Sequence, residues 1–193
     1  KLIENIRSPH ASNAIQRRQL DLLRELNISH QRARSSNPKL DARIESFELA
    51  FRMQLEATDA FDIAKEPANI RAMYGDHVHG RQTLIARRLL ERGVRVVQLW
   101  HGAGQPWDHH DNIEGNIRKH AGEIDGPIAA LMADLKQRGM FEDTLILWGG
   151  EFGRTPSVEL GDSGKSKLGL DHSHYGFRVW LAGGGVRGGT AYG

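Results

Sequence analysis

Hydrophobic positions in the first 75 residues recur at the period of a helix. One such stripe is formed by Ile15, Leu20, Leu22, Leu23 and Leu26, and a second by Ile44, Phe47, Phe51 and Leu55. An apolar stripe at this spacing predicts an amphipathic helix. We therefore expect a helical portion over residues 1–75, whose apolar faces pack on the rest of the domain or, alternatively, accept a partner helix in a groove.

From about Gly80 the pattern changes to an alternation of helices and strands. A helix is expected over residues 82–91, and an apolar stripe from Ile124 to Leu135 indicates another. The runs at 94–100 and 144–149 are almost wholly apolar and indicate strands, and 177–182 adds a third whose direction is open. Strand, helix and strand of this kind are typical of a parallel βαβ unit covered on both faces. We expect residues 80–193 to form an α/β core portion.

Composition narrows the classes of function. The chain has 26 Lys and Arg against 24 Asp and Glu, a net charge of +2, which disfavours nucleic-acid binding because that function usually needs a clearly basic face. It has no cysteine, which excludes disulfides and thiolate metal sites within it, but 10 histidines. No apolar run approaches the roughly 18 residues of a membrane span.

The length of 193 residues suits one domain with a sizeable core. The chain begins at Lys1 and breaks off in a turn-like stretch, 189–193. We therefore expect it to be part of one domain of a longer protein, with an incomplete sheet.

Acids and histidines follow the two expected strands. Asp108 and His110 come after the first, and Glu151 comes directly after the second, with Asp171 and His172 further along. In open α/β sheets, ligands bind beyond the carboxyl ends of the strands. We expect these five side chains to meet around one divalent metal ion, because together they offer carboxylate oxygens and imidazole nitrogens.

Mixed oxygen and nitrogen ligands favour zinc or manganese over calcium, which prefers oxygen alone. Arg154 offers a forked donor to a tetrahedral anion, or alternatively pairs with Glu151. Each residue taken alone also has a structural interpretation, since loop histidines are often only solvated and an acid after a strand often caps the next turn. The minor candidates are His109, His120 and His174, while His77 and His79 are expected at the surface.

Several strings in the chain resemble one bacterial family. They are LDARIESFELAFRMQ, RQTLIARRLLERGVRVVQL, WDHHDN, PIAALMADLKQRGMFEDTLILWGGEFGRTP and, near the end, DH followed by WLAGGGVRGG. This combination resembles the domain of unknown function 1501 family of the alkaline phosphatase-like, or sulfatase-like, superfamily, over most of the chain from about Asp41. The resemblance implies a doubly wound, mostly parallel sheet flanked by helices, with a metal centre at the carboxyl edge of the sheet.

By order along the chain, the resemblance places Asp108 and His110 in the first ligand group of the superfamily and His172 in the last. Glu151 and Phe152 stand where superfamily members have an Asp-His pair. Phenylalanine cannot bind a metal, so a single-metal or altered site is expected rather than a full two-metal centre. The nucleophile of the superfamily is expected before Lys1, and the family implies export to the periplasm or cell exterior.

The sequence therefore predicts a metal-dependent hydrolase of sulfate or phosphate esters, acting on a small-molecule or polysaccharide substrate. In this prediction Asp108, His110 and His172 hold the ion, Glu151 and Asp171 support it, and Arg154 binds the anion. The alternative is a non-catalytic exported binding or scaffold protein that keeps the fold. Phe152 is the feature that favours this alternative.

Overall fold

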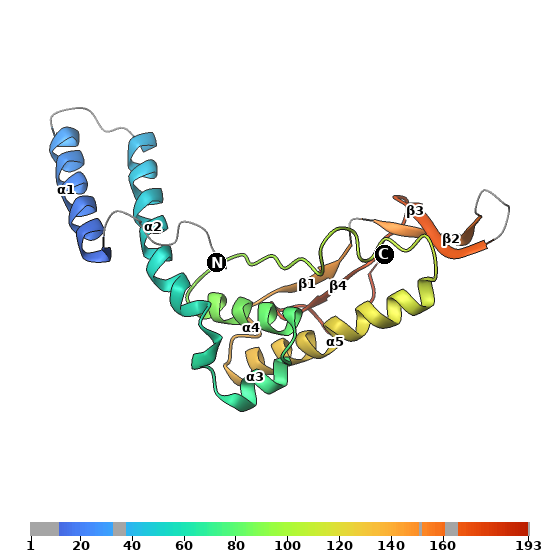
Figure 1. The fold of residues 1–193 in the computed structure, drawn as a ribbon. Coiled ribbons are helices and arrows are strands. Elements are labelled where there is room, and N and C mark those ends of the chain that lie inside the picture. The colour runs from blue at the N-terminus through green and yellow to red at the C-terminus, as the bar shows by residue number, and fades with distance from the viewer. Residues whose placement is uncertain (1–11, 33–37, 151, 161–165, 193) are drawn as a thin grey trace. The chain divides into compact units, whose positions relative to one another are not determined.

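The computed structural model describes residues 12–32, 38–150, 152–160 and 166–192 (Figure 1). Of these residues, 54% are helical. Contacts divide the chain into two compact units, Lys1–Asp62 and Ile63–Gly193. Among the helices described, none combines the length and the apolar character needed to cross a lipid bilayer.

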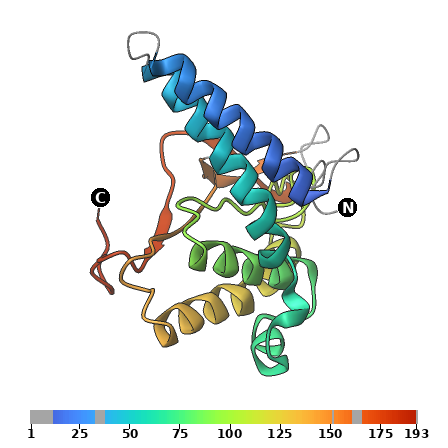
Figure 2. The same cartoon turned by 90° about the vertical axis from the view of Figure 1, so that its left-hand side faces the viewer.

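The first unit consists of two helices that lie side by side (Figure 2), α1 (Asn13–Arg32) and α2 (Pro38–Ala60). Arg17 on α1 donates hydrogen bonds of 3.2 and 3.3 Å to the two carboxylate oxygens of Glu48 on α2. Its guanidinium also lies over the ring of Phe51, 5.1 Å from the ring centroid. The helices expected in this part of the sequence are therefore joined through Arg17. The apolar stripe expected to pack on the rest of the domain is largely exposed, since Leu22, Leu23 and Leu26 are all more than half exposed.

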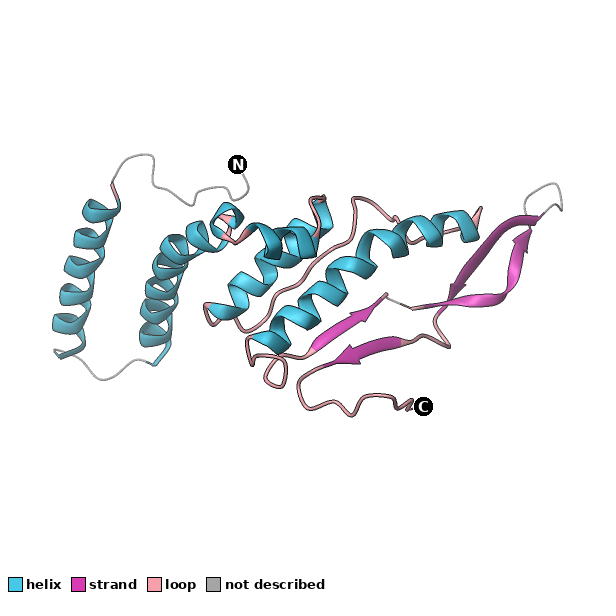
Figure 3. Ribbon diagram, turned by 90° about the horizontal axis from the view of Figure 1, so that it is seen from below, coloured by secondary structure: helices cyan, strands magenta, loops and turns pink. Residues whose placement is uncertain are grey.

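The second unit is helical on one side and carries short strands on the other (Figure 3). Its helices are η1 (Ile63–Lys65), α3 (Ala68–Tyr74), α4 (Val78–Glu91) and α5 (Ile113–Gln137). Its strands are β1 (Ile146–Gly149), β2 (Gly153–Leu160), β3 (Ser166–Ser173) and β4 (Val179–Ala182). The buried core lies where α3, α4 and α5 meet, and its members are Tyr74, Leu84, Ala130, Leu131 and Leu135.

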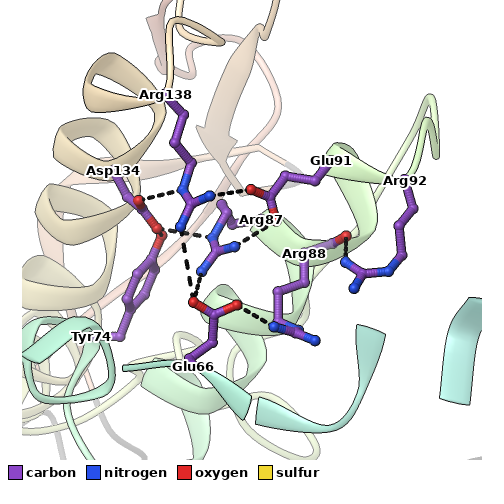
Figure 4. Close-up of polar contacts among 8 residues, drawn as sticks. All are labelled: Glu66, Tyr74, Arg87, Arg88, Glu91, Arg92, Asp134 and Arg138. Atoms are coloured by element: carbon purple, nitrogen blue, oxygen red, sulfur yellow. Dashed lines mark hydrogen bonds and ion pairs between the residues drawn. The ribbon is translucent and has the colours of Figure 1, made fainter. Parts of the chain in front are cut away.

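A network of buried charges accompanies this core (Figure 4). Arg87 on α4 is only 1% exposed and lies within ion-pair distance of Glu66 at 2.6 Å, Glu91 at 2.5 Å and Asp134 at 2.9 Å. Arg138 binds the other oxygen of Asp134 at 2.7 Å. Buried charges are tolerated only when paired, so this network fixes α4 against α5 and against the segment before α3.

Helix α5 extends from the core towards the β2–β3 ribbon (Figure 3). Pro127 divides it into two halves with different contacts. The half beyond Pro127 contributes Ala130, Leu131 and Leu135 to the core and Asp134 to the charge network. The half before it carries His120 and Glu123. Pro127 is buried inside the helix. Because proline has no N–H, the carbonyl of Glu123 lacks its usual intrahelical donor.

The predicted doubly wound, mostly parallel sheet is wrong for the described residues. The strands form two separate two-stranded sheets, and both are antiparallel: β1 pairs with β4, and β2 with β3. The apolar run at 94–100 forms no strand, although 144–149 and 177–182 contain β1 and β4 as expected. Val96 is 83% exposed and Trp100 is 75% exposed. An apolar run becomes a strand only when it pairs with a neighbouring strand, and no described strand pairs with this run.

The β2–β3 ribbon replaces the predicted sheet edge as the element that brings distant residues together. Arg154 on β2 pairs directly with His172 on β3, and cross-strand partners place their side chains on the same face. The ribbon is fixed to the loop before α5 by a hydrogen bond of 3.1 Å from the backbone N–H of Leu170 to the carbonyl of His109. At Gly169 the backbone passes so close to His110 that a Cβ would lie 2.0 Å from the His110 carbonyl carbon.

Candidate metal centre

Asp108, His110 and His172 meet at the junction of the loop before α5 and the β2–β3 ribbon. The Nε2 atom of His172 lies 2.7 Å from Oδ1 of Asp108, and Nε2 of His110 lies 3.0 Å from the same oxygen. One donor atom from each of the three residues lies within 4.8 Å of the others. The β2–β3 ribbon brings His172 to Asp108, whereas the sequence predicted that neighbouring parallel strands would do so.

Arg154 completes this cluster. Its Nη1 donates a hydrogen bond of 2.7 Å to Oδ1 of Asp108, and its Nη2 donates one of 3.1 Å to the carbonyl of Trp107. Three cationic or potentially cationic groups thus converge on one carboxylate oxygen. The hydrogen bond from His172, followed by that from Arg154, lowers the pKa of Asp108 to about 2. The carboxylate is therefore ionised at neutral pH and can serve as an anionic ligand.

The surroundings of the cluster leave it partly open. The side chain of Asp108 is 19% exposed, whereas those of His110 and His172 are 39% and 38% exposed. The ring of Phe152 packs on His172 with 4.9 Å between ring centroids. The cluster is thus accessible to a small ligand while one imidazole is held by an apolar neighbour.

The other predicted site residues lie elsewhere. Glu151 is outside the described residues. Asp171 is exposed, and its Oδ1 accepts a 2.7 Å hydrogen bond from the backbone N–H of His172, so its described contact supports the backbone and not the cluster. His174 is exposed and contacts Tyr175, with ring centroids 4.0 Å apart.

A second group of possible ligands packs against the ring of Trp107 and consists of His101, His120 and Glu123. The Oε2 atom of Glu123 lies 3.0 Å from Nε2 of His101 and 3.1 Å from Nδ1 of His120. The hydrogen bond from His120, assisted by the charges of His120 and His101, lowers the pKa of Glu123. Sequence reasoning did not select Glu123 or His101 and treated His120 as a minor candidate. The available signal was the His-x-x-Glu spacing on an expected helix, because residues three apart share a face.

His109 belongs to this second group and not to the first, contrary to its placement beside Asp108 in the sequence. It is 7% exposed, and its ring is stacked on that of His120 at 5.5 Å with an interplanar angle of 1°. His79 also joins, with its ring 5.1 Å from that of His101, and is half-buried rather than exposed. Burial lowers the pKa of both His79 and His109. Both imidazoles are therefore neutral at physiological pH.

Comparison with known proteins identifies a family but no characterised relative. No curated protein matches the chain, and no solved structure matches it. The family model described as "Protein of unknown function (DUF1501)" matches residues 2–193. The chain therefore belongs to the DUF1501 family.

Proposed function

We propose that this chain supplies the metal site of a hydrolase acting on phosphate or sulfate esters. The observation that carries the proposal is the convergence of His110, His172 and Arg154 on Oδ1 of Asp108. One carboxylate and two imidazoles are a donor set that suits Zn²⁺ or Mn²⁺. Catalytic zinc sites commonly use three protein ligands and keep one position for water or substrate.

At such a site the ion, Arg154 and Phe152 would have different roles. A bound divalent ion would supply Lewis-acid polarisation of the ester oxygen and a coordinated water with a pKa near about 7. Arg154 has five N–H donors in a rigid fork, and its contacts with Asp108 and the Trp107 carbonyl hold it beside the cluster. Its remaining donors can bind the oxygens of a tetrahedral anion. Phe152 fixes the imidazole of His172 by packing against it.

The ester class rests on this local arrangement and on the resemblance of the sequence motifs to alkaline phosphatase-like enzymes. It does not rest on the fold, because the described residues lack the parallel sheet of those enzymes. No nucleophile is assigned within the chain. A tetrahedral, doubly or singly charged anion is the substrate group that a cation with an adjacent arginine stabilises best.

A non-catalytic metal-dependent or anion-binding protein is the second candidate. The observation in its favour is Phe152, whose ring lies 4.9 Å from His172 at the position where the superfamily resemblance would place a further ligand. An apolar ring there limits the cluster to fewer ligands than a two-metal phosphatase centre requires. Binding without turnover is the expected behaviour if the site holds an anion but activates no nucleophile.

Metal content and turnover together test the proposal. The purified chain, equilibrated with excess Zn²⁺ and then desalted, is compared with Asp108→Ala and with the matched control Asp171→Ala, whose exposed carboxylate lies next to His172. We expect Asp108→Ala to lose one ion per chain and the control to retain it. We also expect the full-length protein to cleave 4-nitrophenyl phosphate or 4-nitrophenyl sulfate and to lose this activity with Asp108→Ala. Unchanged zinc content in Asp108→Ala would refute the metal site, and a bound ion without cleavage of either ester would favour the second candidate.

A further inference from the structure

The structure brings together two groups of potential ligands, and only the group at Asp108 corresponds to the superfamily pattern. The other group packs against the Trp107 indole and is formed by His101 in the loop and by His120 and Glu123, one helical turn apart on α5. The side chains of His101 and His120 are 13% and 14% exposed, and that of Glu123 is 43% exposed. A cluster of this composition needs an explanation, because two imidazoles around one carboxylate are the ligands of known catalytic zinc sites.

We propose that His101, His120 and Glu123 form a second transition-metal site, with Zn²⁺ as the fitting ion, separate from the site at Asp108. Their donor atoms lie within 4.8 Å of one another. The present distances of 3.0 and 3.1 Å to Oε2 of Glu123 are those of hydrogen bonds. Zinc bonds to nitrogen and oxygen measure about 2.0–2.2 Å, so an ion between the three groups would fit with little movement of the side chains. Each imidazole would keep its single proton, on the ring nitrogen that does not face the ion.

The neighbouring histidines provide an independent observation. His109 and His79 each have a buried ring nitrogen, Nε2 and Nδ1 respectively, for which the described residues supply no hydrogen-bond partner. Their rings lie against His120 and His101. A buried polar atom without a partner is costly. Two such atoms beside the same cluster indicate a place built to receive a polar ligand or an ion rather than a filled apolar core.

Trp107 sets the tautomer of His101. Its indole N–H donates a 3.0 Å hydrogen bond to Nδ1 of His101. Neutral imidazole carries one proton, so this bond places the proton of His101 on Nε2, the atom that faces Glu123. Metal binding at Nε2 requires the proton to move to Nδ1, and Trp107 then loses its acceptor. The carbonyl of the same Trp107 accepts the hydrogen bond from Arg154, so this one residue contacts both groups of potential ligands.

The experiment counts zinc ions in the purified chain. We expect two Zn²⁺ per chain, one after Glu123→Gln, one after Asp108→Ala and none after both changes. Asp125→Asn is the matched control, since Asp125 is an exposed acid on the same helix, and it is expected to retain two ions. His101→Gln is a second variant in case Glu123→Gln unfolds, and circular dichroism verifies the fold of each. Retention of the full zinc content by both Glu123→Gln and His101→Gln overturns the proposal, as does loss of both ions from a folded Glu123→Gln protein.

Trp107→Phe gives a readout that a purely structural cluster would not produce. The substitution removes the N–H that holds His101 in the tautomer unable to bind the ion. The parent chain loses the hydrogen bond between Trp107 and His101 when the ion binds, whereas the variant has no such bond to lose. We therefore expect the zinc affinity of this site to increase about five-fold, the effect of one net hydrogen bond. Weaker or unchanged affinity contradicts the assigned role of Trp107. Because Asp108→Ala leaves the second site intact, failure here is distinguishable from failure of the proposed ester hydrolase.

Discussion

Replacing Arg87 by methionine tests the buried charge network directly. Arg87 is 1% exposed and faces three carboxylates, those of Glu66, Glu91 and Asp134. Its Nε and Nη2 atoms lie within ion-pair distance of Asp134 and Glu66 but are not aligned for hydrogen bonds. Their contribution is therefore mainly Coulombic. Methionine keeps an unbranched apolar stem in place of the arginine chain but removes the charge and all of these contacts.

The magnitude follows from what remains after the substitution. Three arginines, at 87, 88 and 138, face three acids, so the network changes from balanced to a net charge of −1. Breaking a buried ion pair by removing one partner typically costs about 3–5 kcal/mol. Arg88 still contacts Glu66, and Arg138 still contacts Asp134. We therefore expect the free energy of unfolding to fall by the lower value, about 3 kcal/mol.

Urea unfolding followed by tryptophan fluorescence measures this change in the second unit alone, because all four tryptophans belong to it. They are Trp100, Trp107, Trp148 and Trp180. The matched control is Arg118→Met on α5, whose side chain is 77% exposed and pairs with Glu114 at 2.9 Å. An exposed pair of this kind contributes at most about 1 kcal/mol. Equal unfolding midpoints for the two variants would refute the reasoning that the buried network determines the stability of this unit.

Three further predictions concern the site and its support. Gly169→Ala is expected to reduce the zinc affinity of the site at Asp108 by more than tenfold. A Cβ at this position would lie 2.0 Å from the carbonyl carbon of His110 and would move the ribbon away from the loop. An unchanged zinc titration at this site would show that the ribbon does not position His172. The pKa of Asp108 is lowered from 3.8 to about 2, so its contribution to stability is present above about pH 4 and is lost as the pH falls towards 2. Acid titration of Asp108→Asn should therefore show a flatter loss of stability over that interval, and a slope identical to that of the parent chain would contradict this. Tyr74→Phe removes a 3.0 Å hydrogen bond to Oδ2 of Asp134 and is expected to lower the unfolding free energy by about 1 kcal/mol. An unchanged midpoint in urea unfolding would contradict this prediction.

The helices were predictable because their stripes are long and periodic, as the residues of α5 from Ile124 to Leu135 demonstrate. The sheet was not. The run at 94–100 has the composition of a buried strand, but strand formation depends on a pairing partner that lies elsewhere in the chain. Composition therefore identified a region able to form a strand without determining whether it does so.

The candidate site was predictable in part. Asp108, His110 and His172 were selected from residue type and order, and the structure brings them together. The route is different from the predicted one, since an antiparallel ribbon carries His172 to Asp108. The contact of His101 with Glu123 depends on how the loop before α5 folds against that helix. The spacing of these residues in the sequence does not determine this loop conformation, so the contact could not be predicted.

Pro127 divides α5 into a half that is anchored in the core and a half that bends more easily. Beyond Pro127 the helix is anchored in the core through Leu131, Leu135 and Asp134. Before it, the missing hydrogen bond to the carbonyl of Glu123 makes bending easier at the turn that carries this carboxylate. Small rotations at this turn would move Glu123 without disturbing the anchored end, so the proline gives this carboxylate room to adjust to a ligand beside it.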